Sequence, residues 1–150
     1  MIKKYLGVIA ILSFNFFAIH NVALAHHSFA AIWDETRELE ITGELSVVRW
    51  VNPHSFFMVS VTDASGNEET YRFENFPPAM LSSLGLSRKT MTDQIGNQVR
   101  VLYNPARDGT RTIGYGRVFD FLDGPTIVFT GDGSGGGSGE PSLGVGVLPE

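Results

Sequence analysis

The sequence contains no cysteine among its 150 residues. That absence excludes disulfide bonds, thiolate metal ligands and thiol nucleophiles together. Basic residues are also scarce, with 11 lysines and arginines against 16 aspartates and glutamates and a net charge of −5. Binding to nucleic acid or to an anionic membrane surface depends on basic side chains, so we expect neither partner.

Patterns typical of common enzymes are missing as well. The sequence shows no Ser-His-Asp order, no zinc-protease helix and no phosphate-binding loop. The stretch GDGSGGGSG is rich in glycine, but it has neither the spacing of a phosphate loop nor a helical pattern after it. We therefore expect a binding or accessory protein rather than an enzyme.

Long apolar runs are confined to the start of the chain. Two lysines precede an apolar run over residues 5–18, and the letters ALA at 23–25 form the small-x-small pattern of a signal-peptidase site. The alternative is a membrane anchor, but the run is shorter than the roughly 20 residues that a spanning helix needs. We expect residues 1–25 to be a signal peptide, cleaved after Ala25, that exports the protein to the periplasm without stable membrane insertion.

From residue 37 onward, apolar and polar residues alternate as in a half-buried β-strand. Gly43 lies within the first such stretch and predicts a bend or a close crossing. The phase slips at Val47 and Val48, which predicts a β-bulge. The stretches SFFMVSVTD and ETYRFEN flank the turn ASGNE and predict a hairpin. The residues that we expect to face inward on this hairpin are Phe57, Tyr71 and Phe73.

The second half of the domain predicts one helix and further strands. PPAMLSSLGLS is typical of a short helix that ends at Gly85, and strands are expected around residues 99–103 and within RTIGYGRVFDFLDGPTIVF. Three strands, a helix and two or more strands is the element order of an OB-like barrel. We predict an all-β domain over residues 26–130, a small OB-like barrel of five to six strands, with an open β-sandwich as the alternative. Residues 131–150, rich in glycine and serine, are predicted to be a disordered tail.

The histidines carry the first functional hypothesis. Cleavage after Ala25 would make His26 the N-terminus, and its α-amino group, with a pKa near 8, could chelate one metal ion together with its imidazole. Cu(II) binds nitrogen-rich ligand sets more tightly than other first-row divalent ions do. We predict a Cu(II) site formed by His26, His27 and His54, as in the histidine brace of copper proteins, with Asp34 and Glu35 as nearby oxygen donors. The alternative is that these histidines are ordinary polar residues of a chain end and a turn.

The aromatic residues carry a second hypothesis. Alternation places most of them in the core but leaves Trp50, Phe56 and Phe76 as candidates for the surface. OB-like barrels commonly bind ligands through aromatic side chains on this part of the sheet. We predict as the alternative function an interaction surface of Trp50, Asn52 and Phe56 that binds a small molecule or a periplasmic protein without a metal.

Three segments together resemble a known family. The segments are AHHSFAAIWD, TGELSVVRWVNPHSFFMVSV and NPARDGTRTIGYGRV. Over residues 26–129 the chain resembles domain-of-unknown-function family 6152, an uncharacterised family of small exported bacterial proteins. The resemblance implies export and a small β-rich domain, and it brings no established activity. It marks the HHSF and W-x-NPH residues as motif positions of unknown role. Where members have a Gly-Trp-Thr stretch, this chain has Gly85-Leu86-Ser87, so the role of that tryptophan does not transfer.

Overall fold

A computed structural model describes residues 29–130 and 142–146 of the chain. The described part is mostly β-structure, in one sheet with the strand order β3-β2-β1-β4-β5-β6-β7. The strands are β1 (Leu39–Arg49), β2 (Ser55–Thr62), β3 (Glu68–Asn75), β4 (Gln98–Pro105), β5 (Ile113–Phe121), β6 (Thr126–Thr130) and β7 (Ser142–Gly146). The described helices are short: α2 (Phe29–Ile32), α3 (Pro78–Ser83) and α4 (Arg88–Thr92).

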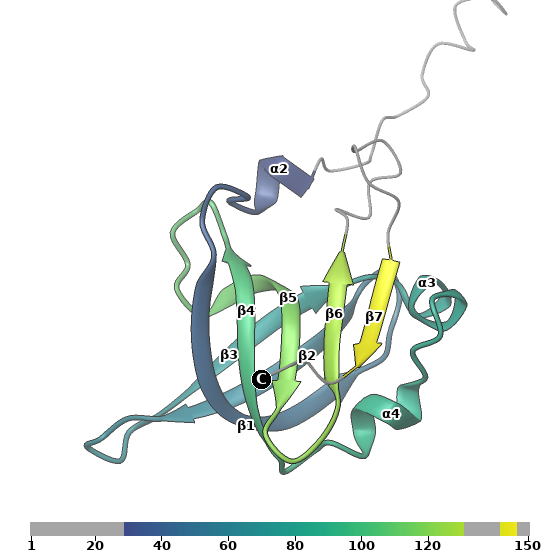
Figure 1. Ribbon diagram of the computed structural model, residues 1–150. Helices are drawn as coiled ribbons and strands as arrows, with labels where there is room; N and C mark the ends of the chain where they lie inside the picture. Colours follow the sequence, from purple (N-terminus) through teal and green to yellow (C-terminus); the bar gives the residue numbers. More distant parts are fainter. Residues whose placement is uncertain (1–28, 131–141, 147–150) are drawn as a thin grey trace, which may run out of the picture.

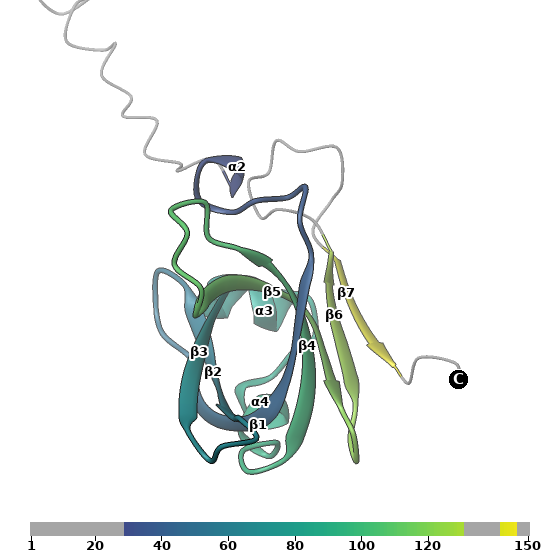
Figure 2. The same ribbon diagram turned by 90° about the vertical axis from the view of Figure 1, so that its left-hand side faces the viewer.

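The first five strands close into a barrel because β3 also pairs with β5, in parallel. Figure 2 shows these strands as a ring, with α3 and α4 behind it and β6 and β7 outside it. This connectivity is that of an OB-like barrel, which confirms the predicted fold class over the open sandwich. Pairing between β3 and β5 leaves the ring without an edge at that point.

Strand β1 serves both sides of the barrel by pairing with β4 along its first half and with β2 along its second. The register with β2 shifts between Leu45 and Val47, next to the predicted bulge. Gly43 lies where the two neighbours meet, and a Cβ atom there would be 2.4 Å from the backbone oxygen of Ser60. The predicted close crossing at Gly43 is therefore confirmed.

The helical region after β3 contains two helices where one was predicted. Gly85, at a φ of +95°, ends α3, as expected for a C-terminal glycine. A new helix begins after Ser87, whose hydroxyl accepts a hydrogen bond from the Thr90 amide at 3.0 Å. The apolar residues of this region, Leu81, Leu86 and Met91, are fully buried. They cover the end of the barrel on which α3 and α4 lie in Figure 1.

The core is dominated by aromatic side chains inside the ring. Phe57, Tyr71 and Phe73 are buried, as predicted from the alternation. Phe119 of β5 packs edge-on against Phe57 and against Phe129 of β6, at ring-centroid distances of 5.2 and 5.9 Å. Strand β6 therefore contributes to the barrel core although it lies outside the closed ring.

Strand β7 pairs with β6 over residues 142–146, inside the segment for which the sequence predicted disorder. Hydrogen bonding along β6 provides the order that the composition of this segment does not predict. Residues 131–141 and 147–150 lie outside the described residues, and so does the predicted signal peptide at residues 1–25. Within the ranges that the structure describes, no helix is long and apolar enough to cross a membrane.

Candidate functional site

The motif WVNPH forms the corner between β1 and β2. β1 ends at Arg49 and β2 begins at Ser55, and between them the Asn52–Pro53 peptide bond is cis. Proline has no amide hydrogen to continue the ladder, so the chain leaves the sheet here. The side chain of His54 is 46% exposed, which leaves its ring accessible to solvent at this corner.

The ring of His54 is oriented by a carboxylate. Its Nδ1 contacts Oε1 of Glu74 on β3, and the Glu74 side chain is only 18% exposed. A histidine that donates Nδ1–H to a carboxylate presents Nε2 as the acceptor nitrogen. Metal-binding histidines are commonly held in this way, because the carboxylate fixes both the tautomer and the direction of the ring. The corner therefore presents one imidazole nitrogen in a defined orientation.

The sequence analysis did not identify Glu74. A signal for it was present: Tyr71 and Phe73 face inward, so alternation puts Arg72 and Glu74 on the outside of β3. The sequence did not give the register between β2 and β3. In that register Phe56 is the Cα partner of Glu74, so the start of β2 lies beside Glu74.

The N-terminal end of the described chain packs on β5, the strand that pairs with β3 at Glu74. The ring of Phe29 in α2 packs edge-on against Tyr115 of β5, with the ring centroids 4.7 Å apart. Tyr115 is in turn the Cα partner of Glu74 in the parallel β3–β5 ladder. The first described residue of the chain thus contacts the ladder partner of the residue that contacts His54.

Phe76 connects Tyr115 of β5 with Ser55 at the start of β2. The ring of Phe76 lies 5.9 Å from that of Tyr115, and the backbone oxygen of Phe76 accepts a hydrogen bond from the Ser55 amide at 3.2 Å. Phe76 is only 3% exposed, so the prediction that it is a surface contact was wrong. It belongs to an aromatic cluster that α2 covers, which consists of Phe29, Trp33, Phe76 and Tyr115.

The other two predicted metal ligands, His26 and His27, lie outside the described residues. His26 is three residues before Phe29 in the sequence, and an extended chain of that length spans about 10 Å. Residues 29–130 and 142–146 contain no group of three His, Cys, Asp or Glu side chains suited to a metal ion. A metal site at His54 would therefore need further ligands from outside the described residues.

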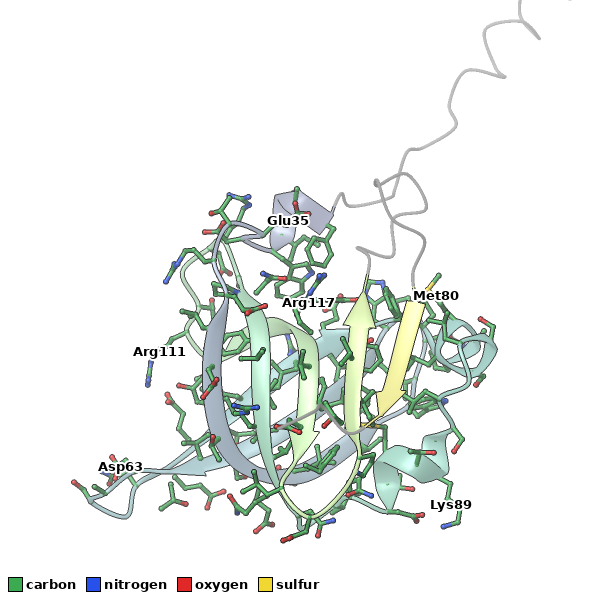
Figure 3. The ribbon with its side chains drawn as sticks, in the orientation of Figure 1. Glu35, Asp63, Met80, Lys89, Arg111 and Arg117 are labelled. Atoms are coloured by element: carbon green, nitrogen blue, oxygen red, sulfur yellow. The ribbon has the colours of Figure 1, made fainter. Side chains whose placement is uncertain are left out.

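The carboxylate of Asp34 is already engaged. Its Oδ1 accepts hydrogen bonds from the hydroxyl and the amide of Thr36 at 2.7 and 3.2 Å. These bonds, together with the nearby Arg107, lower the pKa of Asp34. Figure 3 shows Glu35 just beyond α2, whereas Asp63 lies at the far tip of the β2–β3 hairpin. Asp34 thus serves the local turn.

The residues of the aromatic hypothesis differ in how exposed they are. Trp50 is half-buried and packs against the core, whereas Asn52 is exposed at the corner. Phe56 is half-buried on the outside of β2, and the guanidinium of Arg72 lies 5.1 Å from the centre of its ring. Because Arg72 already covers one face of this ring, a ligand could stack only on the other face. Binding at these residues stays a prediction.

Comparison with known proteins identifies a family and no individual relative. The sequence model of a family of unknown function (DUF6152) matches residues 16–115, which include the corner, α2 and the β3–β5 pairing. No curated protein and no solved structure matches the chain. The function must therefore be argued from the residues of the corner.

Proposed function

The chain belongs to the family of unknown function DUF6152, and we propose that it is an exported periplasmic accessory protein that binds Cu(II). In this proposal, cleavage after Ala25 exposes the α-amino group of His26. That amine, the imidazoles of His26 and His27, and Nε2 of His54 are the nitrogen ligands. The observation that carries the proposal is the contact between Nδ1 of His54 and the carboxylate of Glu74.

The chemistry of this ligand set favours copper. Amine and imidazole nitrogens suit Cu(II), and the chain has no cysteine that would favour a softer ion. Glu74 would act without binding the metal, because its carboxylate raises the basicity of the imidazole and holds the ring in place. The acidic net charge of −5 also favours the accumulation of a cation near the surface.

We expect the purified protein to bind one equivalent of Cu(II) in a His54-dependent manner. The chain is expressed with residues 1–25 in place and purified from the periplasm, and mass spectrometry identifies its N-terminus. Titration against a competing chelator then gives the affinity, and EPR reports the nitrogen ligands. His54→Ala should lower the affinity at least tenfold, because it removes one of the nitrogen ligands.

Two matched comparisons test the parts of the site separately. Glu74→Gln should weaken Cu(II) binding about ten- to a hundredfold, the usual effect of losing a carboxylate behind a ligating histidine. Glu69→Gln, at the other end of β3, should leave the affinity unchanged. A chain with one extra alanine before His26 should bind more weakly, since its amine is displaced. Equal affinity of the parent and His54→Ala would contradict the proposal.

A further inference from the structure

The outer face of β1, β2 and β3 carries two arginines without an acidic partner. Arg49 ends β1 and Arg72 lies within β3, and both side chains are exposed. The ion pairs between described residues use other cationic side chains, and neither Arg49 nor Arg72 takes part in one. The chain has 16 acidic residues against 11 basic ones, so a shortage of carboxylates does not explain these two.

Strand pairing brings both arginines to the same aromatic ring. Arg49 is the Cα partner of Phe56 on β2, and Phe56 is in turn the Cα partner of Glu74 on β3. Paired residues lie on the same side of a sheet, and so do residues two apart on one strand, such as Arg72 and Glu74. All four therefore share the outer face, where the guanidinium of Arg72 lies 5.1 Å from the centre of the Phe56 ring.

The carboxylate in this row is engaged elsewhere. Glu74 contacts the imidazole of His54 and neither guanidinium. Arg72 is oriented by the ring of Phe56, and a guanidinium that lies over a ring keeps its N–H donors at its edge. The group is thus held in place and can still bind an anion.

Apolar side chains lie between and beside the arginines. Met58 is the Cα partner of both Arg72 and Val47, and Met58 and Val47 are half-buried. Val51, at the corner that follows β1, is 45% exposed. Arginine, methionine and aromatic residues are the side chains enriched in protein–protein interfaces. The composition of this face therefore favours a protein as its partner.

We propose that Arg49, Phe56, Met58 and Arg72, here called the arginine face, dock an extended acidic segment of a partner protein. The Cα atoms of the two arginines lie two strands and two residues apart, which corresponds to about 12 Å. In an extended segment, residues four apart are separated by about 13 Å, so two carboxylates at that spacing reach both guanidinium groups. Charge complementarity of this kind fixes the register of a partner. The proposal goes beyond copper binding and does not depend on it.

Two other anionic ligands fit the arginine face less well. Oligonucleotides bind through several phosphate contacts along a basic groove, whereas this face offers two arginines next to Glu74. A small carboxylate would use one guanidinium and leave the apolar side chains without a contact. Both ligands are included in the test below.

A synthetic peptide of alternating glutamate and valine, labelled with an uncharged dye, is the probe. In an extended conformation its carboxylates lie on one side. Fluorescence anisotropy is measured with the periplasmic protein at low ionic strength in the presence of EDTA, so that no metal takes part. We expect saturable binding that weakens as salt is added. The same peptide with lysine in place of glutamate should not bind.

Substitutions then locate the site. Arg49→Gln and Arg72→Gln should each weaken binding about two- to fivefold, the effect of losing one exposed ion pair. The double charge reversal, Arg49→Glu with Arg72→Glu, should abolish binding of the acidic peptide and permit binding of the lysine peptide. Arg37→Glu with Arg88→Glu is the matched control, because it changes the net charge equally at exposed positions outside the face. That protein should bind the acidic peptide about as well as the parent.

The contact between Arg72 and Phe56 has a test of its own. Phe56→Leu keeps an apolar side chain but removes the ring that orients the guanidinium, so it should weaken binding in the parent. It should have little effect in the Arg72→Gln background, because the two residues then no longer act together. Circular dichroism checks that each variant folds, and the two glutamine variants carry the test if the double reversal does not fold.

Equal binding by the parent and by the variants at Arg49 and Arg72, or an equal loss in the control at Arg37 and Arg88, would overturn the proposal. Glutarate that competes as well as the peptide at equal carboxylate concentration would show a site for small anions instead. An oligothymidylate that binds more tightly than the peptide, with the same dependence on Arg49 and Arg72, would assign the face to nucleic acid. Each of these results leaves copper binding untouched, since that proposal is tested at His54.

Discussion

His54 and Glu74 show how a single pair of side chains changes the interpretation of a motif. An exposed histidine after Asn-Pro is ordinarily a turn residue, and nothing in the corner distinguishes it. The contact of its Nδ1 with Glu74 gives the ring one orientation and one available nitrogen. The residue that defines the candidate site is therefore a carboxylate on another strand.

A second single residue, Gly43, tests the geometry of β1. A Cβ there would lie 2.4 Å from the Ser60 oxygen, which belongs to the backbone of β2 and cannot move without opening the ladder. Gly43→Ala should lower the free energy of unfolding by about 1–3 kcal/mol, the usual cost of overpacking. Urea denaturation measures this change, with Thr42→Ala at the exposed neighbouring position as the control. An equal and small effect of both substitutions would show that the two strands lie further apart.

At the scale of elements, polar side chains tie β4, β5 and β6 together across the outside of the sheet. Asp120 of β5 accepts a hydrogen bond from the Thr126 hydroxyl at 2.6 Å and another from Arg100 at 2.8 Å. The hydrogen bond from Thr126, followed by the bond and the charge of Arg100, lowers the pKa of Asp120, against an opposing contribution from burial. We therefore expect the attachment of β6 to the barrel to depend on pH.

The lowered pKa of Asp120 predicts how the stability of the fold depends on pH. Because the pKa of Asp120 is below its ordinary value of 3.8 only in the folded chain, ionised Asp120 stabilises the fold above pH 3.8. This stabilisation is lost as the pH falls through the lowered pKa. Parent and Asp120→Asn should therefore differ most in unfolding free energy near neutral pH, and the difference should shrink from about pH 5 downward.

Denaturation curves at a series of pH values would measure that difference. Asp123→Asn, in the exposed turn between β5 and β6, is the control and should follow the parent throughout. A difference between parent and Asp120→Asn that stays constant down to pH 2 would show that Asp120 contributes by packing and not by charge.

For the whole molecule, the question is how far the folded unit extends beyond the closed ring. The ring of Phe129 on β6 lies 6.4, 6.2 and 5.9 Å from the rings of Phe57, Phe76 and Phe119. This one side chain connects the barrel core with the aromatic cluster under α2. Strand β6 is therefore part of the unit that folds.

Phe129→Ala should accordingly cost as much as a change inside the ring. We expect a loss of about 3–5 kcal/mol in unfolding free energy, the range for removal of a buried phenylalanine. Val128→Ala, at the half-buried neighbouring position, should cost clearly less. Chemical denaturation of both variants is the measurement, and similar small losses would mean that β6 unfolds separately from the barrel.

Local patterns in the sequence predicted much of this fold. Alternation along β1 to β3, the glycine at the crossing, the turn residues and the order of elements all predicted an OB-like barrel. These features depend on neighbouring residues only, because side chains alternate along any strand and turns require particular backbone angles. The W-x-NPH corner and the family were recognisable for the same reason.

Contacts between distant segments decided the rest. The pairing of β3 with β5 makes Tyr115 the ladder partner of Glu74, and α2 then covers a ring that alternation alone would leave in solvent. The burial of Phe76 and the order of β7 likewise depend on partners elsewhere in the chain. Which strands lie side by side, and what covers their outer face, is set by closure of the barrel. For that reason Glu74 became visible only in the tertiary structure, while His54 was already a candidate in the sequence.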